Sequence, residues 1–100
     1  MTEVRTQPVK AQRFEDIDDV RGKPGAFEFY RHGERYPAGM LFSCPCGCKL
    51  IASLAFRPAS KEDRASWEWD GDMDAPTLSP SVHNVGHWHG WLKNGIWESV

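Results

Sequence analysis

Cysteine is missing from this chain of 100 residues except in one pentapeptide, CPCGC, which holds Cys44, Cys46 and Cys48. A disulfide framework would spread an even number of cysteines along the chain, so the sequence excludes a small disulfide-bonded secreted domain. Residues 1–20 lack the apolar run of a signal peptide. No stretch approaches the roughly 18–20 apolar residues of a membrane span. We therefore expect a soluble protein of the reducing cytoplasm.

Excess charge of either sign is also missing. Twelve Lys and Arg residues face fourteen Asp and Glu residues, which gives a formal net charge of −2 at pH 7. The basic residues are scattered along the chain, so they do not form the footprint of a protein that binds nucleic acid or an anionic membrane. We therefore expect the partner to be a host or phage protein, and we expect neither nucleic acid nor a membrane.

The composition changes once along the chain, and its length is that of one domain. Residues 1–23 are polar and charged, and they predict an arm that is partly flexible or forms an edge strand, with a helical turn in FEDIDDV at residues 14–20. Residues 24–100 carry the apolar patterns of the folded domain. The five tryptophans of the chain are expected to pack its small core, because large side chains gain the most buried area.

Short stretches in which apolar and polar residues alternate predict strands. These stretches are AFEFYR (26–31), MLFSC (40–44), KLIASLAF (49–56), SWEWDG (66–71), TLSPSVHN (77–84), HWHGWLK (87–93) and GIWESV (95–100). HGERYPAG (32–39) reads as a loop and RPASKEDRAS (57–66) as a polar connection. Asn94–Gly95 is a strong signal for a two-residue hairpin. The pattern predicts an all-β domain of six or seven short antiparallel strands, with CPCGC at a hairpin tip.

The thiols and two later histidines form a candidate metal site. His87 and His89 are two residues apart, so their side chains would leave a strand on the same face. Thiolates and imidazoles are ligands that suit tetrahedral Zn²⁺. The spacing leaves open which four of five candidates bind the metal: Cys44, Cys46, Cys48, His87 and His89. His83 is a weaker sixth candidate.

No catalytic signature accompanies these residues. The sequence has no H-E-x-x-H motif and lacks the signature of the zinc deaminases. The acidic stretch WEWDGDMD and the serines Ser79 and Ser81, which flank Pro80, contain the groups that acid–base chemistry would use. Acidic side chains in a turn that contains glycine are usually turn formers, however. We therefore assign no catalytic residue from the sequence and favour a function other than catalysis.

The order of the motifs is familiar. Between about residues 40 and 97 the chain carries LFSCPCGC, WEWDG and PTLSPSV, followed by a histidine and an Asn-Gly turn. This order resembles a family of small bacterial, phage and prophage proteins that is described only as a domain of unknown function. The resemblance implies a compact metal-binding β domain encoded by a phage. It matches the histidine of that family to His89 and puts His87 where many members have a cysteine.

These observations predict a zinc-stapled β domain that acts as a binding module on a host or phage protein in the host cytoplasm. Zinc would contribute to folding, because a small domain gains much from a cross-link between distant segments. The alternatives are a metal-dependent enzyme of the hydrolase type and a nucleic-acid-binding zinc-ribbon accessory protein. The sequence specifies neither the partner nor the oligomeric state.

Overall fold

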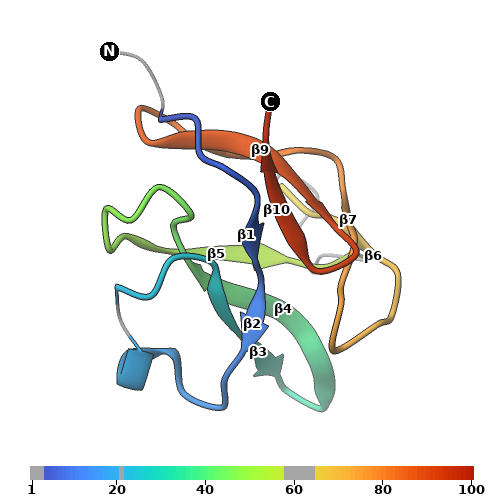
Figure 1. The fold of residues 1–100 in the computed structure, drawn as a ribbon. Helices are drawn as coiled ribbons and strands as arrows, with labels where there is room; N and C mark the ends of the chain where they lie inside the picture. The colour runs from blue at the N-terminus through green and yellow to red at the C-terminus, as the bar shows by residue number, and fades with distance from the viewer. Residues whose placement is uncertain (1–3, 21, 58–64) are drawn as a thin grey trace.

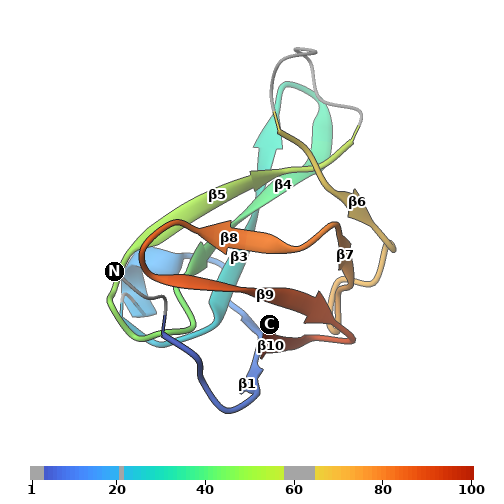
Figure 2. The same cartoon turned by 90° about the horizontal axis from the view of Figure 1, so that it is seen from above.

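The computed structural model describes residues 4–20, 22–57 and 65–100, and it is built almost entirely of short strands (Figure 1). One sheet has the order β1-β10-β9-β8 and is called the first sheet here. Its strands are β1 (Val9–Lys10), β8 (Val82–Asn84), β9 (Trp88–Lys93) and β10 (Ile96–Ser99). All its neighbouring strands pair in the antiparallel sense. In the view from above, β8, β9 and β10 follow one another across the molecule (Figure 2).

The second sheet has the order β2-β3-β4-β5. Its strands are β2 (Gln12–Arg13), β3 (Ala26–His32), β4 (Arg35–Ser43) and β5 (Ile51–Ala55). A pair of two-residue strands, β6 (Glu68–Trp69) and β7 (Leu78–Ser79), and the 3-10 helix η1 (Ile17–Val20) complete the described part of the chain. The β-dominated fold is therefore confirmed. The described residues form ten strands, more than the six or seven predicted, because four of the ten are only two residues long.

The core lies between the two sheets and is rich in aromatic side chains. Along β9 every second residue is buried in it, as the pleat of a half-buried strand requires. Trp88 and Trp97 from the first sheet are fully buried and meet edge to face, with ring centroids 5.8 Å apart. Phe42 from the second sheet stacks on Trp97 at 4.8 Å. The indole N–H of Trp97 donates to the carbonyl of Gly25 at 3.0 Å, so its polar atom is also satisfied.

Both predicted hairpins form. β9 and β10 are joined at Asn94–Gly95, where both residues have positive φ (49° and 72°), as a tight turn of this kind needs. β4 and β5 pair from Gly39↔Ala55 to Ser43↔Ile51, so CPCGC does lie in the connection of that hairpin. The stretch predicted as one strand at residues 77–84 forms two, and Pro80 lies between β7 and β8.

The prediction of a loop at residues 32–39 is wrong. β4 begins at Arg35, and His32 pairs with Arg35 across a turn of only two residues. Pro37 fits inside this strand because the β3–β4 ladder is irregular there: the pairing jumps from Tyr30↔Gly39 to His32↔Arg35. A proline lacks the N–H that a regular ladder uses, so it is accommodated where the ladder is interrupted.

The N-terminal segment joins both sheets. β1 pairs with β10 at the edge of the first sheet, and β2 pairs in parallel with β3 at the edge of the second. Ala11 and Ile17 are each only 2% exposed, so residues 4–20 contribute to the core. The 3-10 helix falls within the predicted helical turn at residues 14–20. The division into an arm and a domain at residue 23 stays a prediction.

Most of the polar connection predicted at residues 57–66 lies outside the described residues. Within the described ranges, no helix has the length and apolar character needed to cross a membrane.

Candidate functional site

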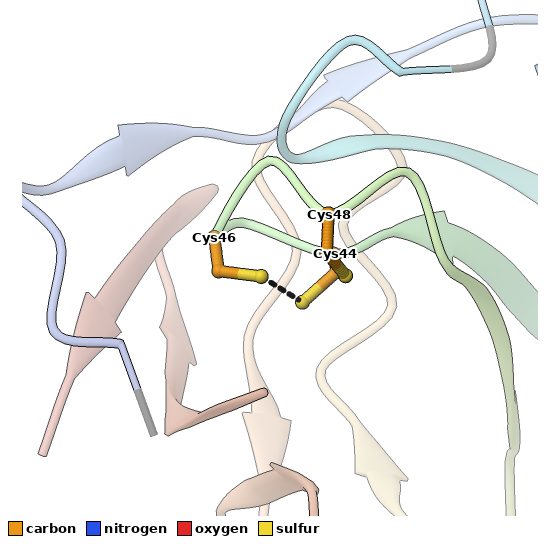
Figure 3. Close-up of side chains that lie close together, drawn as sticks. All are labelled: Cys44, Cys46 and Cys48. Atoms are coloured by element: carbon orange, nitrogen blue, oxygen red, sulfur yellow. Dashed lines mark hydrogen bonds between the residues drawn. The ribbon is translucent and has the colours of Figure 1, made fainter. Parts of the chain in front are cut away.

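The three cysteines of CPCGC gather their sulfur atoms in one place (Figure 3). All three Sγ atoms lie within 4.8 Å of one another, and those of Cys44 and Cys46 are 3.2 Å apart. The turn is tight because Gly47 has φ of 85° and its N–H donates to the carbonyl of Cys44 at 3.0 Å. The N–H of Cys44 donates to the carbonyl of Leu50 at 2.9 Å, which closes the loop between β4 and β5.

Exposure increases along this turn. Cys44 is fully buried in the core, Cys46 is half-buried against it, and Cys48 is exposed. Burial, followed by hydrogen bonding to the other two thiols, raises the pKa of Cys46 to about 12. Burial also acts to raise the pKa of Cys48, but hydrogen bonds from the backbone N–H of Leu50 and from the neighbouring thiols lower it overall. The turn therefore holds one thiol that deprotonates easily beside one that does not.

The geometry of the thiols fits a metal ion. A tetrahedral zinc ion with Zn–S bonds of about 2.3 Å would separate two sulfur ligands by roughly 3.8 Å. That separation lies within the span of the cluster. Thiolates are the protein ligands that zinc and other soft cations prefer, and binding would release the protons that the thiols carry. The turn can therefore supply three ligands to one metal ion.

The structure does not bring the two predicted histidine ligands into this cluster. Among the described residues, the group of mutually close metal-binding side chains consists of the three cysteines alone. His87 is exposed in the turn between β8 and β9, where its carbonyl accepts a hydrogen bond from the N–H of Val4 at 2.9 Å. His89 lies on β9, and its ring contacts the side chains of Ser81 and His83. A ligand set that joins cysteines to these histidines stays a prediction.

The ring of His89 lies against a serine. Its Nε2 atom is 3.2 Å from Oγ of Ser81, which is within hydrogen-bonding distance. Both side chains are half-buried, so the pair is accessible from the solvent. A hydroxyl within hydrogen-bond reach of an imidazole is the arrangement that activates a serine nucleophile. The sequence analysis did not identify this pair.

The β8–β9 ladder brings Ser81 and His89 together. Val82 pairs with Gly90 and His83 pairs with His89, so Ser81 leaves the chain just before β8 on the same face as the histidines. The opposite face of the ladder enters the core through Val82 and Trp88, which are 1% and 0% exposed. The requirement to bury those two side chains therefore fixes the serine and the histidine on the outer face.

Trp67 supports the serine from a different part of the chain. Its indole N–H donates to the carbonyl of Ser81 at 3.2 Å. The backbone of Trp67 is itself attached to the end of β5, because its N–H donates to the carbonyl of Ala55 at 2.9 Å. This contact links the start of β8 to the second sheet, and no local pattern in the sequence predicts it.

The acidic stretch behaves as a turn former. Oδ1 of Asp72 accepts hydrogen bonds from the N–H groups of Ala75 and Asp74, both at 2.9 Å, and these bonds lower the pKa of Asp72. Oδ1 of Asp70 accepts from the N–H groups of Asp72 and Thr77. These carboxylates organise the connection between β6 and β7.

Together, these features define a small β protein of two four-stranded sheets and one two-stranded pair, with a three-thiol turn and a serine–histidine pair. The family model of the bacterial ubiquitination-like system serine protease (BubE) matches residues 14–100. This match covers well over half of the chain, so the protein belongs to the BubE family. Comparison with the curated proteins and with the solved structures finds no match. The family is bacterial, which agrees with that part of the resemblance, and the phage or prophage origin stays a prediction.

Proposed function

We propose that this protein is a serine peptidase of a bacterial ubiquitination-like system, with Ser81 as its nucleophile and His89 as its general base. The observation that carries the proposal is the 3.2 Å distance between Oγ of Ser81 and Nε2 of His89. The name of the family supplies the reaction class and the biological setting. The proposal replaces the metal-ligand role that we predicted for His89 with a role in proton transfer.

The chemistry follows from the two groups. The Ser81 hydroxyl donates its proton to Nε2 of His89 while Oγ forms a bond to the carbonyl carbon of the scissile peptide. The imidazolium then returns the proton to the amine that leaves, and an acyl-enzyme remains. Water activated by the same imidazole hydrolyses the ester and restores the serine. A general base of this kind contributes about 10²- to 10⁴-fold to the rate.

Other serines of the described residues are less suited to this role. Ser43 is only 1% exposed, so a polypeptide substrate cannot reach it. Ser99 already accepts a hydrogen bond from the indole N–H of Trp88 at 3.0 Å and contacts Thr6 on the inner side of the sheet. Ser81 combines access from the solvent with a histidine within hydrogen-bond reach.

The cysteine turn has a structural role in this proposal. Cys44, Cys46 and Cys48 would hold a zinc ion as thiolates and stabilise the β4–β5 hairpin, away from the proton transfer between Ser81 and His89. The burial of Cys44 in the core supports such a role, because a metal bound there would tie the loop to the core. The same turn favours our second candidate function, a zinc-stapled interaction module that acts on a host or phage protein without catalysis.

A serine-reactive probe separates the two functions. Diisopropyl fluorophosphate phosphorylates an activated serine, and intact mass spectrometry with peptide mapping identifies the modified residue. We expect labelling at Ser81, loss of labelling in Ser81→Ala, and unchanged labelling in Ser79→Ala, whose serine is exposed on β7. An unlabelled wild-type protein that is folded and binds zinc would overturn the peptidase proposal and favour the interaction module.

A further inference from the structure

His83 lies directly opposite His89 in the β8–β9 ladder. The two imidazole rings stack, with centroids 4.3 Å apart and ring planes inclined by 25°. Ser81 precedes His83 by two residues, so its side chain leaves the chain on the same face. The ring of His89 therefore contacts the serine through Nε2 and contacts His83 through one flat side.

A histidine base needs such a restraint. Its Nε2 atom has to stay within about 2.6–3.2 Å of the hydroxyl to accept the proton. His89 is only half-buried, so rotation about its side-chain torsions would turn the ring towards solvent unless a neighbour held it. In a Ser-His-Asp triad a carboxylate on Nδ1 provides this restraint. Among the described residues, the side chain of His89 contacts Ser81 and His83 and pairs with no carboxylate.

We propose that His83 is the positioning residue of the serine–histidine pair. Its imidazole, stacked on the ring of His89, holds Nε2 of His89 against the Ser81 hydroxyl. This inference rests on the proposed peptidase function and adds a third side chain to it. The contact that carries this role is ring against ring, so a flat ring at position 83 is expected to fulfil it.

Two substitutions at position 83 test whether a flat ring is needed there. His83→Phe keeps a flat ring that can stack, whereas His83→Ala removes the ring. His32→Ala is the matched control, because His32 is an exposed histidine at the end of β3 in the second sheet. Each variant is first checked for an unchanged melting temperature and a native backbone NMR spectrum.

The first readout is the rate of phosphorylation of Ser81 by diisopropyl fluorophosphate. In this reaction the bond from Oγ to phosphorus forms, the P–F bond breaks, fluoride leaves, and the hydroxyl proton passes to Nε2 of His89. We expect His83→Ala to slow labelling about 10- to 100-fold, the size of effect that small misplacements of catalytic groups produce. His83→Phe should recover most of the lost rate, and His32→Ala should match the wild type. A wild-type rate in His83→Ala, or equal losses in both variants, would overturn the inference.

The second readout does not depend on the reaction. Nuclear Overhauser effects between the ring protons of His89 and the β protons of Ser81 report whether the two side chains stay together. We expect these signals in the wild type and in His83→Phe, and we expect their loss in His83→Ala. Their persistence in His83→Ala would overturn the positioning role even if the wild type proved unreactive. Absence of labelling in the wild type would count against the peptidase alone, so the two failures are distinguishable.

Discussion

The cysteine turn and the serine–histidine pair are the two candidate sites found among the described residues, and they are assembled in different ways. The turn gathers Cys44, Cys46 and Cys48 from five consecutive residues, with Gly47 at a positive φ of 85°. The pair joins two residues that are eight apart and meet across the β8–β9 ladder. A turn motif can therefore be recognised in a short stretch of sequence, whereas a pair across a ladder depends on the register of the strands.

The two regions also differ in burial. The turn runs from a fully buried thiol at Cys44 to an exposed one at Cys48, so it is anchored in the core. Ser81 and His89 are half-buried on the outer face of the first sheet. Changes in the turn should therefore act mainly on stability and metal binding, and changes near the pair should act mainly on reactivity.

The largest effect on stability is expected from Cys44→Ser. This change removes a metal ligand and puts a hydroxyl in an apolar site, which alone costs about 1–3 kcal/mol of unfolding free energy if the hydroxyl finds no partner. Cys48→Ser is the matched control, because this exposed side chain can be replaced with little loss of stability in the metal-free protein. Thermal melts and elemental mass spectrometry would check both variants.

We expect Cys44→Ser to lower the melting temperature with and without metal, and Cys48→Ser to lower the metal content while the metal-free melting temperature stays close to that of the wild type. Equal melting temperatures for the wild type and Cys44→Ser would show that the buried end of the turn does not anchor it.

The thiols of the turn should differ in how fast they react with an alkylating agent. The thiolate is the reactive form, so the lowered pKa and exposure of Cys48 should make it the first to be alkylated in metal-free protein near pH 8. Cys46 has a pKa raised to about 12 and should react slowly until the pH approaches that value. Peptide mapping after timed exposure to iodoacetamide would measure the order.

Zinc added before iodoacetamide should protect the cysteines of the turn together, because a bound thiolate is not free to attack. Faster alkylation of Cys46 than of Cys48 at pH 8 would contradict the assignment of Cys48 as the thiol that deprotonates more easily.

A smaller effect on stability than that of Cys44→Ser is expected from Trp67→Phe. This change removes the indole N–H that donates to the carbonyl of Ser81 and keeps an aromatic ring in place. We expect a loss of about 1 kcal/mol in unfolding free energy and a modest slowing of diisopropyl fluorophosphate labelling, because the start of β8 becomes less well held. Trp69→Phe is the control, since the indole of Trp69 donates to the carbonyl of Asp72. Equal labelling by the two variants would show that Trp67 does not position Ser81.

Much of the fold was predictable because its signals are local. Asn94–Gly95 specifies a tight turn, and the alternating pattern of AFEFYR marks a strand with one buried face. The cysteine cluster was also predictable, since three thiols within five residues cannot lie far apart. The extension of β4 through Pro37 was not, because proline in an interrupted ladder looks the same in sequence as proline in a loop.

The candidate site was predictable only in part. The sequence points to His89, but as a metal ligand, because a thiol motif followed much later in the chain by a pair of histidines suggests coordination. The sequence assigns no role to Ser81, which lies in no motif such as the G-x-S-x-G of known serine hydrolases. The spacing from Ser81 to His89 becomes informative only when the β8–β9 register is known.

The β character of this protein, its tight turns and its three-thiol cluster follow from the sequence alone, because each depends on side chains close together along the chain. The set of side chains on the outer face of the first sheet depends instead on how the strands pair in the folded protein. A shift of one residue in the β8–β9 register would move a different set of residues to that face, and the burial of Val82 and Trp88 selects the register that joins Ser81 to His89.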